Sequence, residues 1–178
     1  MMGKLKGFIL FIAFTFFLQS GYALEDTLVL HNGNMIMGAV TSINHYTVSF
    51  KYTNENTEQQ LSNFAIKQIQ FESGRTQMIT EKISIQGEED WEKVIILEDK
   101  EQRTGLKRIS DINAHTKFIN LHTANSGNNK VTEKLKREAA KLNCPFILIN
   151  FDRATVYNGL IKSWGAIQEI KKAFCYNY

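Results

Sequence analysis

Cysteine is scarce in this chain, and its scarcity excludes a protein built on a disulfide framework. The 178 residues contain two cysteines, Cys144 and Cys175, which allow one bridge at most. No cysteine precedes Cys144, so the lipid-bearing cysteine that anchors bacterial lipoproteins cannot form near the N-terminus. An even number of cysteines favours a bridge in an oxidising compartment; the alternative is two buried, reduced thiols that act as small apolar residues.

Sequence motifs for catalysis, phosphate binding and metal binding are also missing. There is no Gly-x-Ser-x-Gly elbow, no cysteine-protease signature and no glycine-rich loop followed by Lys-Ser or Lys-Thr. The sequence therefore predicts no catalytic, cofactor-binding or metal-binding residues. One alternative is a soft-metal site in which a histidine joins Cys144 or Asp152. The histidines lack zinc-ligand spacing, and we interpret them as exposed polar residues of strands and turns: His31, His45, His115 and His122.

The first 23 residues have the three regions of a cleavable signal peptide. Two lysines precede an uncharged apolar run at 8–18, and Gly21 and Ala23 place small residues at the cleavage point. The run is shorter than the roughly 20 apolar residues that a membrane-spanning helix needs, so we expect no integral membrane anchor after cleavage. We therefore predict a mature protein that begins near Leu24 and is periplasmic or secreted.

Positive charge is not in excess once this leader is removed. The chain has 21 basic and 18 acidic residues; the leader holds Lys4 and Lys6, which leaves 19 basic residues and a net charge of +1. Nucleic-acid binding uses a concentrated positive field. We therefore expect no nucleic acid as a partner, and an envelope protein or polymer fits an exported chain better.

Residues 24–82 have the pattern of a small all-β module. Asn32-Gly33 is a strong hairpin signal, and we interpret Gly38 as a bulge glycine. A polar loop is expected at 53–60. Five short strands in few residues favour a closed, barrel-like module or a strongly bent sheet, because closure removes exposed strand edges. The runs of alternating apolar residues predict strands at 27–31, 35–43, 47–52, 66–71 and 75–80.

Residues 91–178 have the pattern of a ββαββ module, so the fold class is α+β. A polar, acidic stretch at 83–90 is predicted to be the linker between the modules. The clearest element is a helix at 130–142, which Pro145 prevents from continuing. We expect this one helix to pack on an antiparallel sheet. The apolar face of the helix contains Val131, Leu135, Ala139 and Leu142, and the strands are predicted at 94–97, 105–117, 146–151 and 164–176.

The candidate disulfide follows from the positions of the last two predicted strands. Cys144 precedes one of them, and Cys175 lies near the end of the other. If the strands pair antiparallel through a turn near Asn158-Gly159, both cysteines lie at the same end of the sheet. Opposed residues there have Cα separations of roughly 4.5 to 5.5 Å, within the range of about 4.4 to 6.8 Å that a disulfide allows.

Two sets of residues resemble known families. The pattern Asp26-x-x-x-x-x-Asn32-Gly33-x-x-Ile36-x-Gly38-x-Val40 resembles a small β module that recurs in uncharacterised secreted proteins of Gram-negative bacteria. In the second half, three stretches carry a second resemblance: Gly105 to Ile109, Leu135 to Leu142 and Phe146 to Ile149. They are similar to the α+β domain of the Rcs envelope-stress lipoprotein and its heavy-metal-binding-like relatives. The resemblance implies an envelope module of binding or sensing type and no catalytic residue.

We therefore expect a non-catalytic binding or adaptor protein of the bacterial envelope. Two alternatives stay open: a hydrolase of envelope or extracellular polymers, with a site assembled from dispersed acids such as Asp111 and Asp152, and a structural subunit of an envelope assembly. An exposed aromatic patch would favour a partner surface, but core packing is the interpretation that we prefer for the same aromatics. These aromatics are Trp91, Trp164, Tyr176 and Tyr178.

Overall fold

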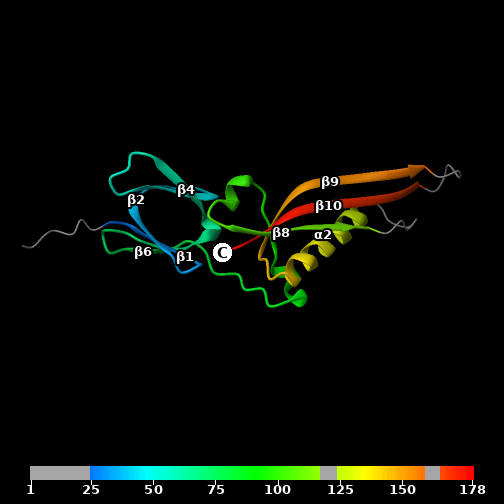
Figure 1. The fold of residues 1–178 in the computed structure, drawn as a ribbon, viewed down its shortest axis with the longest axis horizontal. Coiled ribbons are helices and arrows are strands. Elements are labelled where there is room, and N and C mark those ends of the chain that lie inside the picture. The colour runs from blue at the N-terminus through cyan, green and yellow to red at the C-terminus, as the bar shows by residue number, and fades with distance from the viewer. Residues whose placement is uncertain (1–24, 117–123, 159–164) are drawn as a thin grey trace, which may run out of the picture.

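The computed structural model describes residues 25–116, 124–158 and 165–178. Figure 1 shows two groups of strands, one formed by the first half of the chain and one by the second, which meet near the end of the chain. The predicted leader, His122 and Trp164 lie outside the described residues. No helix among the described residues is long and apolar enough to cross a membrane.

The first group is a six-stranded antiparallel sheet with the order β4-β3-β2-β1-β5-β6. The polar loop expected at 53–60 is wrong in its second half, where β4 begins. Three of the five side chains of β4 are exposed polar groups, so the strand has no apolar alternation and is held by backbone pairing with β3. The strands are β1 (Thr27–Leu30), β2 (Met35–Ile43), β3 (Thr47–Tyr52), β4 (Glu58–Ser62), β5 (Ile66–Gln70) and β6 (Thr76–Met78).

This sheet bends around its own core. Strands β3 and β5 are separated in the sheet by β2 and β1, yet their side chains share one apolar cluster, which requires a bent sheet. The order still has two ends, β4 and β6, and no pairing among the described strands joins them. The barrel-like closure is therefore not seen. The buried residues of the cluster are Leu28, Leu30, Val48, Phe50, Ile66 and Ile69.

A close approach between two backbones explains Gly38. A Cβ atom at this position would lie 2.2 Å from the carbonyl oxygen of Lys51 on β3, so no other residue fits without moving the strand. The register shift in β2 lies between Val40 and Ser42, so the interpretation of Gly38 as a bulge glycine is wrong. Gly33, with φ of 92°, lies in the turn of the predicted β1–β2 hairpin, which is confirmed.

The second group is a four-stranded sheet with the order β7-β9-β10-β8, and α2 packs against β8 and β10 on one of its faces (Figure 1). The ββαββ order is confirmed. The expectation of an all-antiparallel sheet is wrong, because β7 pairs parallel to β9. The connection between them, which contains β8 and α2, has the length that parallel pairing requires. The elements are β7 (Ile95–Ile96), β8 (Lys107–His115), α2 (Ala124–Lys141), β9 (Phe146–Asn158) and β10 (Gly165–Asn177).

The buried face of α2 follows the predicted spacing. Val131, Leu135 and Ala139 are fully buried against the sheet, as expected. The helix is longer than predicted at its start, and it ends one residue earlier. Leu142, which was placed on the buried face, is therefore 44% exposed just beyond the last turn, and Asn143 follows in a left-handed conformation.

The predicted bridge between Cys144 and Cys175 is present, with a Cα–Cα distance of 5.9 Å. Its geometry differs in one respect from the expectation. The residue directly opposite Cys175 on β9 is Ile147, so the bridge joins β10 to the loop after α2 and not to an opposed strand position. Both cysteines are fully buried in the core beneath the helix.

The two sheets are joined by a third apolar cluster. Phe64, in the short 3-10 helix between β4 and β5, packs on Phe146 of the second sheet, with ring centroids 5.0 Å apart. The backbone N–H of Ser62 donates to the carbonyl of Thr104 at 2.9 Å. Ile85, which lies in the polar stretch at 83–90, is buried in the core beneath α2. The connecting segment is therefore packed against the second module.

Candidate functional site

The aromatic residues considered for an exposed patch do not form one among the described residues. Tyr176 is buried at the junction, and Tyr178 packs there beside Phe146. Trp91 is half-buried against the core under α2, and the guanidinium of Arg137 lies 4.8 Å from the centroid of its ring. Core packing is the better interpretation of these three aromatics.

The three described histidines lie on different segments of the chain. His31 is buried at the end of the first sheet, which contradicts its expected exposure. His45 is exposed and stacks on Tyr46, and His115 is exposed at the end of β8. The described residues contain no group of three or more His, Cys, Asp or Glu side chains arranged to hold a metal ion. Cys144, the ligand suggested for a soft-metal site, is held in the disulfide.

The two acids considered for a hydrolase are not brought together. Asp111 pairs in register with Phe174 of β10, and Asp152 with Lys171 of the same strand. Residues three apart on a strand point to opposite faces of the sheet. Asp111 forms an ion pair with Arg108, and Asp152 accepts a hydrogen bond from the nearly buried Lys171 at 2.6 Å. Each acid therefore has a local structural partner.

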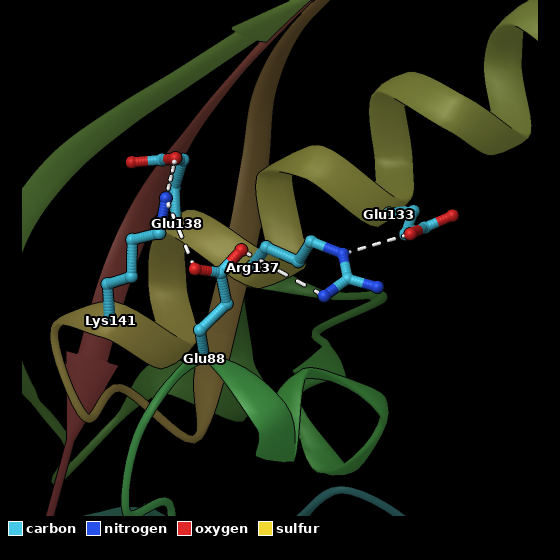
Figure 2. Close-up of polar contacts among 5 residues, drawn as sticks. All are labelled: Glu88, Glu133, Arg137, Glu138 and Lys141. Carbon is cyan, nitrogen blue, oxygen red and sulfur yellow. Dashed lines mark hydrogen bonds and ion pairs between the residues drawn. The ribbon is translucent and has the colours of Figure 1, made fainter.

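A charged hollow of about 360 Å³ lies between α2, β8 and the segment that connects the two sheets. Figure 2 shows the ion pairs that Glu88, Arg137, Glu138 and Lys141, which line it, form with one another and with Glu133. Glu88 lies 3.9 Å from a guanidinium nitrogen of Arg137 and 3.6 Å from the ammonium of Lys141. The same two cations bind Glu133 and Glu138, each at 2.9 Å. These ion pairs hold the connecting segment against α2, so the charged residues of the hollow have a structural role.

The strongest candidate for a binding surface is an apolar groove on the outer face of the first sheet. Its volume is about 560 Å³, which lies within the range of about 300 to 1,000 Å³ that is typical of ligand sites. Met35 and Met78 are 68% and 56% exposed, so the apolar surface that lines it is open to solvent. We call this feature the methionine groove; its principal lining residues are Val29, His31, Met35, Lys67, Met78 and Lys82.

The strand register places the apolar residues of the groove in one row. Val29 pairs with Met35 on one side and with Gln68 on the other, and Gln68 pairs with Met78. Opposed residues of neighbouring strands point to the same face, so these four side chains cross the sheet from β2 to β6. Their face is opposite to the core face that Leu28 and Ile69 occupy.

His31 is a buried residue at one end of the methionine groove, and the charges of two lysines act on it. Its Nε2 lies 3.0 Å from Thr80 Oγ1. Burial lowers the pKa of His31, the charges of Lys82 and Lys67 lower this pKa further, and the hydrogen bond to Thr80 opposes the shift. The imidazole is therefore neutral near pH 7, and the two ammonium groups make this end of the groove electropositive.

Sequence reasoning missed this groove, although β2 carried a signal for it. The prediction of a strand at 35–43 used alternating apolar residues and did not consider that Met35 and Met37, on the outward face, are apolar as well. A strand that is apolar on both faces needs cover on both faces or exposes one of them.

Family models, curated proteins and solved structures were compared with this chain, and none of them matches it.

Proposed function

We propose that this chain is a non-catalytic, periplasmic or secreted binding or adaptor protein of the bacterial envelope, and that the methionine groove receives its partner. The observation that carries the proposal is the solvent exposure of Met35 and Met78 in a groove of ligand-binding size. Contiguous exposed apolar surface on a soluble protein commonly marks an interaction site. Methionine side chains are flexible and polarisable, so they fit partners of different shape.

Two features of the sequence support the envelope location. Residues 1–23 have the order of regions found in a signal peptide, and the second module is similar to that of the Rcs envelope-stress lipoprotein and its relatives. We expect export to leave a mature chain that begins near Leu24. Intact-mass measurement of protein from the native host tests this, and a chain that keeps Met1 in the cytoplasmic fraction would contradict it.

Site-specific crosslinking in living cells tests the binding role. A photoreactive phenylalanine analogue is placed at Met78, in the groove, and in a control at Gln59, an exposed position on β4. We expect covalent adducts with a discrete partner from position 78 and none from position 59. The absence of an adduct at position 78, or the same adducts at both positions, would contradict the proposal.

A further inference from the structure

We propose that the methionine groove takes an extended, acidic segment of a partner protein, in which apolar side chains alternate with aspartate or glutamate. This inference rests on the proposed function, because it names the chemistry of the partner that the groove receives. The methionine groove gives three independent indications of that chemistry: the row of apolar side chains, the sign of the charge beside it and the open strand edge at its border.

The apolar row selects apolar side chains at alternate positions. Met35, Val29 and Met78 lie along one line across four strands, with Gln68 between the last two. Met37 continues the exposed apolar surface on β2, two residues from Met35 on the same face. An extended segment at the border of this surface turns every second side chain toward it, so apolar residues are expected at those positions.

The charge at the groove selects acids for the other positions. Lys67 is exposed and forms no ion pair or side-chain hydrogen bond within the described part of the chain. Lys82 donates to the carbonyl of His31 at 3.2 Å, which holds its charge at the groove. Among the described residues, Glu81 is the one acid that lines the groove, so the two lysines leave a net positive charge there. A segment with carboxylates is attracted by this charge, and one with ammonium groups is repelled.

The strand edge beside the groove selects an extended conformation. β6 is the last strand in the order of the first sheet, so no described strand pairs with its outer side. Met78 belongs to this strand and also lines the groove. An extended segment that adds backbone hydrogen bonds to this edge runs along β6 and turns every second side chain to the face of Met78.

An anionic membrane surface has the same sign of charge and is the less suitable partner. Recognition of anionic lipid bilayers by charge uses clusters of about four to eight basic residues, whereas Lys67 and Lys82 are the two lysines that line the groove. A bilayer also offers no backbone groups to the open edge of β6. The observations therefore favour a peptide segment.

Binding of two matched synthetic peptides tests the inference. One alternates leucine with aspartate and the other leucine with lysine; each carries the same fluorescent label. Fluorescence anisotropy is measured with the oxidised protein from residue 24 to residue 178. We expect the acidic peptide to bind and the basic peptide to bind at least tenfold more weakly, with the acidic complex weakened by added salt.

A charge reversal in the groove provides the decisive variant. Lys67→Glu removes a side chain without a described polar partner, so the fold is preserved, and the acidic peptide is expected to lose roughly threefold to tenfold in affinity while the basic peptide gains. Lys107→Glu, at an exposed lysine of β8, is the matched control and leaves both affinities unchanged. The double variant Met35→Ser/Met78→Ser is expected to lower the affinity for the acidic peptide by a factor that does not depend on the salt concentration.

Several outcomes would overturn the inference. The two peptides could bind equally well, or neither could bind. Lys67→Glu could leave the affinity for the acidic peptide unchanged, or phosphatidylglycerol vesicles could bind where the acidic peptide does not. The crosslinking at position 78 decides the proposed function separately. A partner captured there through a segment without acidic residues would leave the binding role standing and refute the acidic segment.

Discussion

The phenol oxygen of Tyr178 accepts a hydrogen bond from the backbone N–H of Ile83 at 2.9 Å. Tyr178 follows β10, and Ile83 lies just beyond the first sheet, so this bond joins the two halves of the chain. The same tyrosine ring lies 4.9 Å from the ring of His31 and 5.4 Å from that of Phe146. Tyr178 therefore contacts both the junction and His31 at one end of the methionine groove.

Removal of the Tyr178 hydroxyl is expected to destabilise the protein. Tyr178→Phe leaves the N–H of Ile83 without its acceptor, at a cost of about 1 to 2 kcal/mol, and Tyr178→Ala adds the loss of ring packing for a total of about 3 to 5 kcal/mol. Urea unfolding measures both changes. Tyr52→Phe is the control, because Tyr52 is 40% exposed, and its change is expected to stay within about 0.5 kcal/mol. Equal effects of Tyr178→Phe and Tyr52→Phe would show that the hydrogen bond contributes nothing.

The disulfide is expected to provide a large part of the stability of the second module. Closing a loop with a sequence separation of 31 stabilises the folded state by roughly 3.5 kcal/mol in the chain-entropy description. The double variant Cys144→Ala/Cys175→Ala is expected to lose about this amount in urea unfolding. A reducing agent should destabilise the native protein by a similar amount and leave the variant unchanged. Two free thiols per chain in denatured, unreduced protein would contradict the bridge.

The buried imidazole of His31 is expected to make stability depend on pH. Its pKa in the folded state is lowered from 6.5, so the unfolded chain binds a proton more readily. The contribution of His31 is therefore complete above about pH 6.5 and is lost as the pH falls through the lowered value. His31→Gln keeps hydrogen-bonding groups but does not titrate there. Urea unfolding between about pH 7.5 and about pH 5 should show a smaller loss of stability in this variant; parallel losses would refute the assignment.

A side chain at position 38 is expected to separate β2 from β3. The added methyl group of Gly38→Ala would meet the carbonyl oxygen of Lys51, and overpacking of this kind costs about 1 to 3 kcal/mol, occasionally more. Ala39→Ser, at the exposed neighbouring position, is the control. Thermal unfolding monitored by circular dichroism measures the difference. A transition temperature for Gly38→Ala equal to that of Ala39→Ser would show that the strand moves without cost.

Local patterns predicted much of the fold because they report burial on one face. The spacing of Val131, Leu135 and Ala139 identified the helix face, and the Asn32-Gly33 turn identified the first hairpin. β4 was missed because an edge strand held by backbone pairing needs no apolar alternation. The parallel pairing of β7 was missed because a two-residue strand carries no information about its partner's direction.

The candidate site was predictable to a smaller extent. The pairing of Cys144 with Cys175 followed from compartment and strand order, whereas the groove depends on which residues meet across four strands. Met78 lies more than 40 residues from Met35 in the chain, and no sequence spacing relates them. The sequence alone predicted an exposed His31. The residues that cover it, Tyr178 and Lys82, come from distant segments, so no local pattern indicates its burial.

The place of β10 in the second sheet sets an order of assembly. β10 is the last strand of this sheet in the chain, yet it lies between β9 and β8. These two strands do not pair with each other, so β10 alone connects β8 to the rest of the sheet. The first sheet has all six of its strands before residue 79 and can form its core while the rest of the chain is still being made. The second sheet must wait for β10, and until then β9 and β8 expose unpaired edges. The pairing of β10 is thus the step that completes the sheet, allows the disulfide to form and brings Tyr178 to the first module.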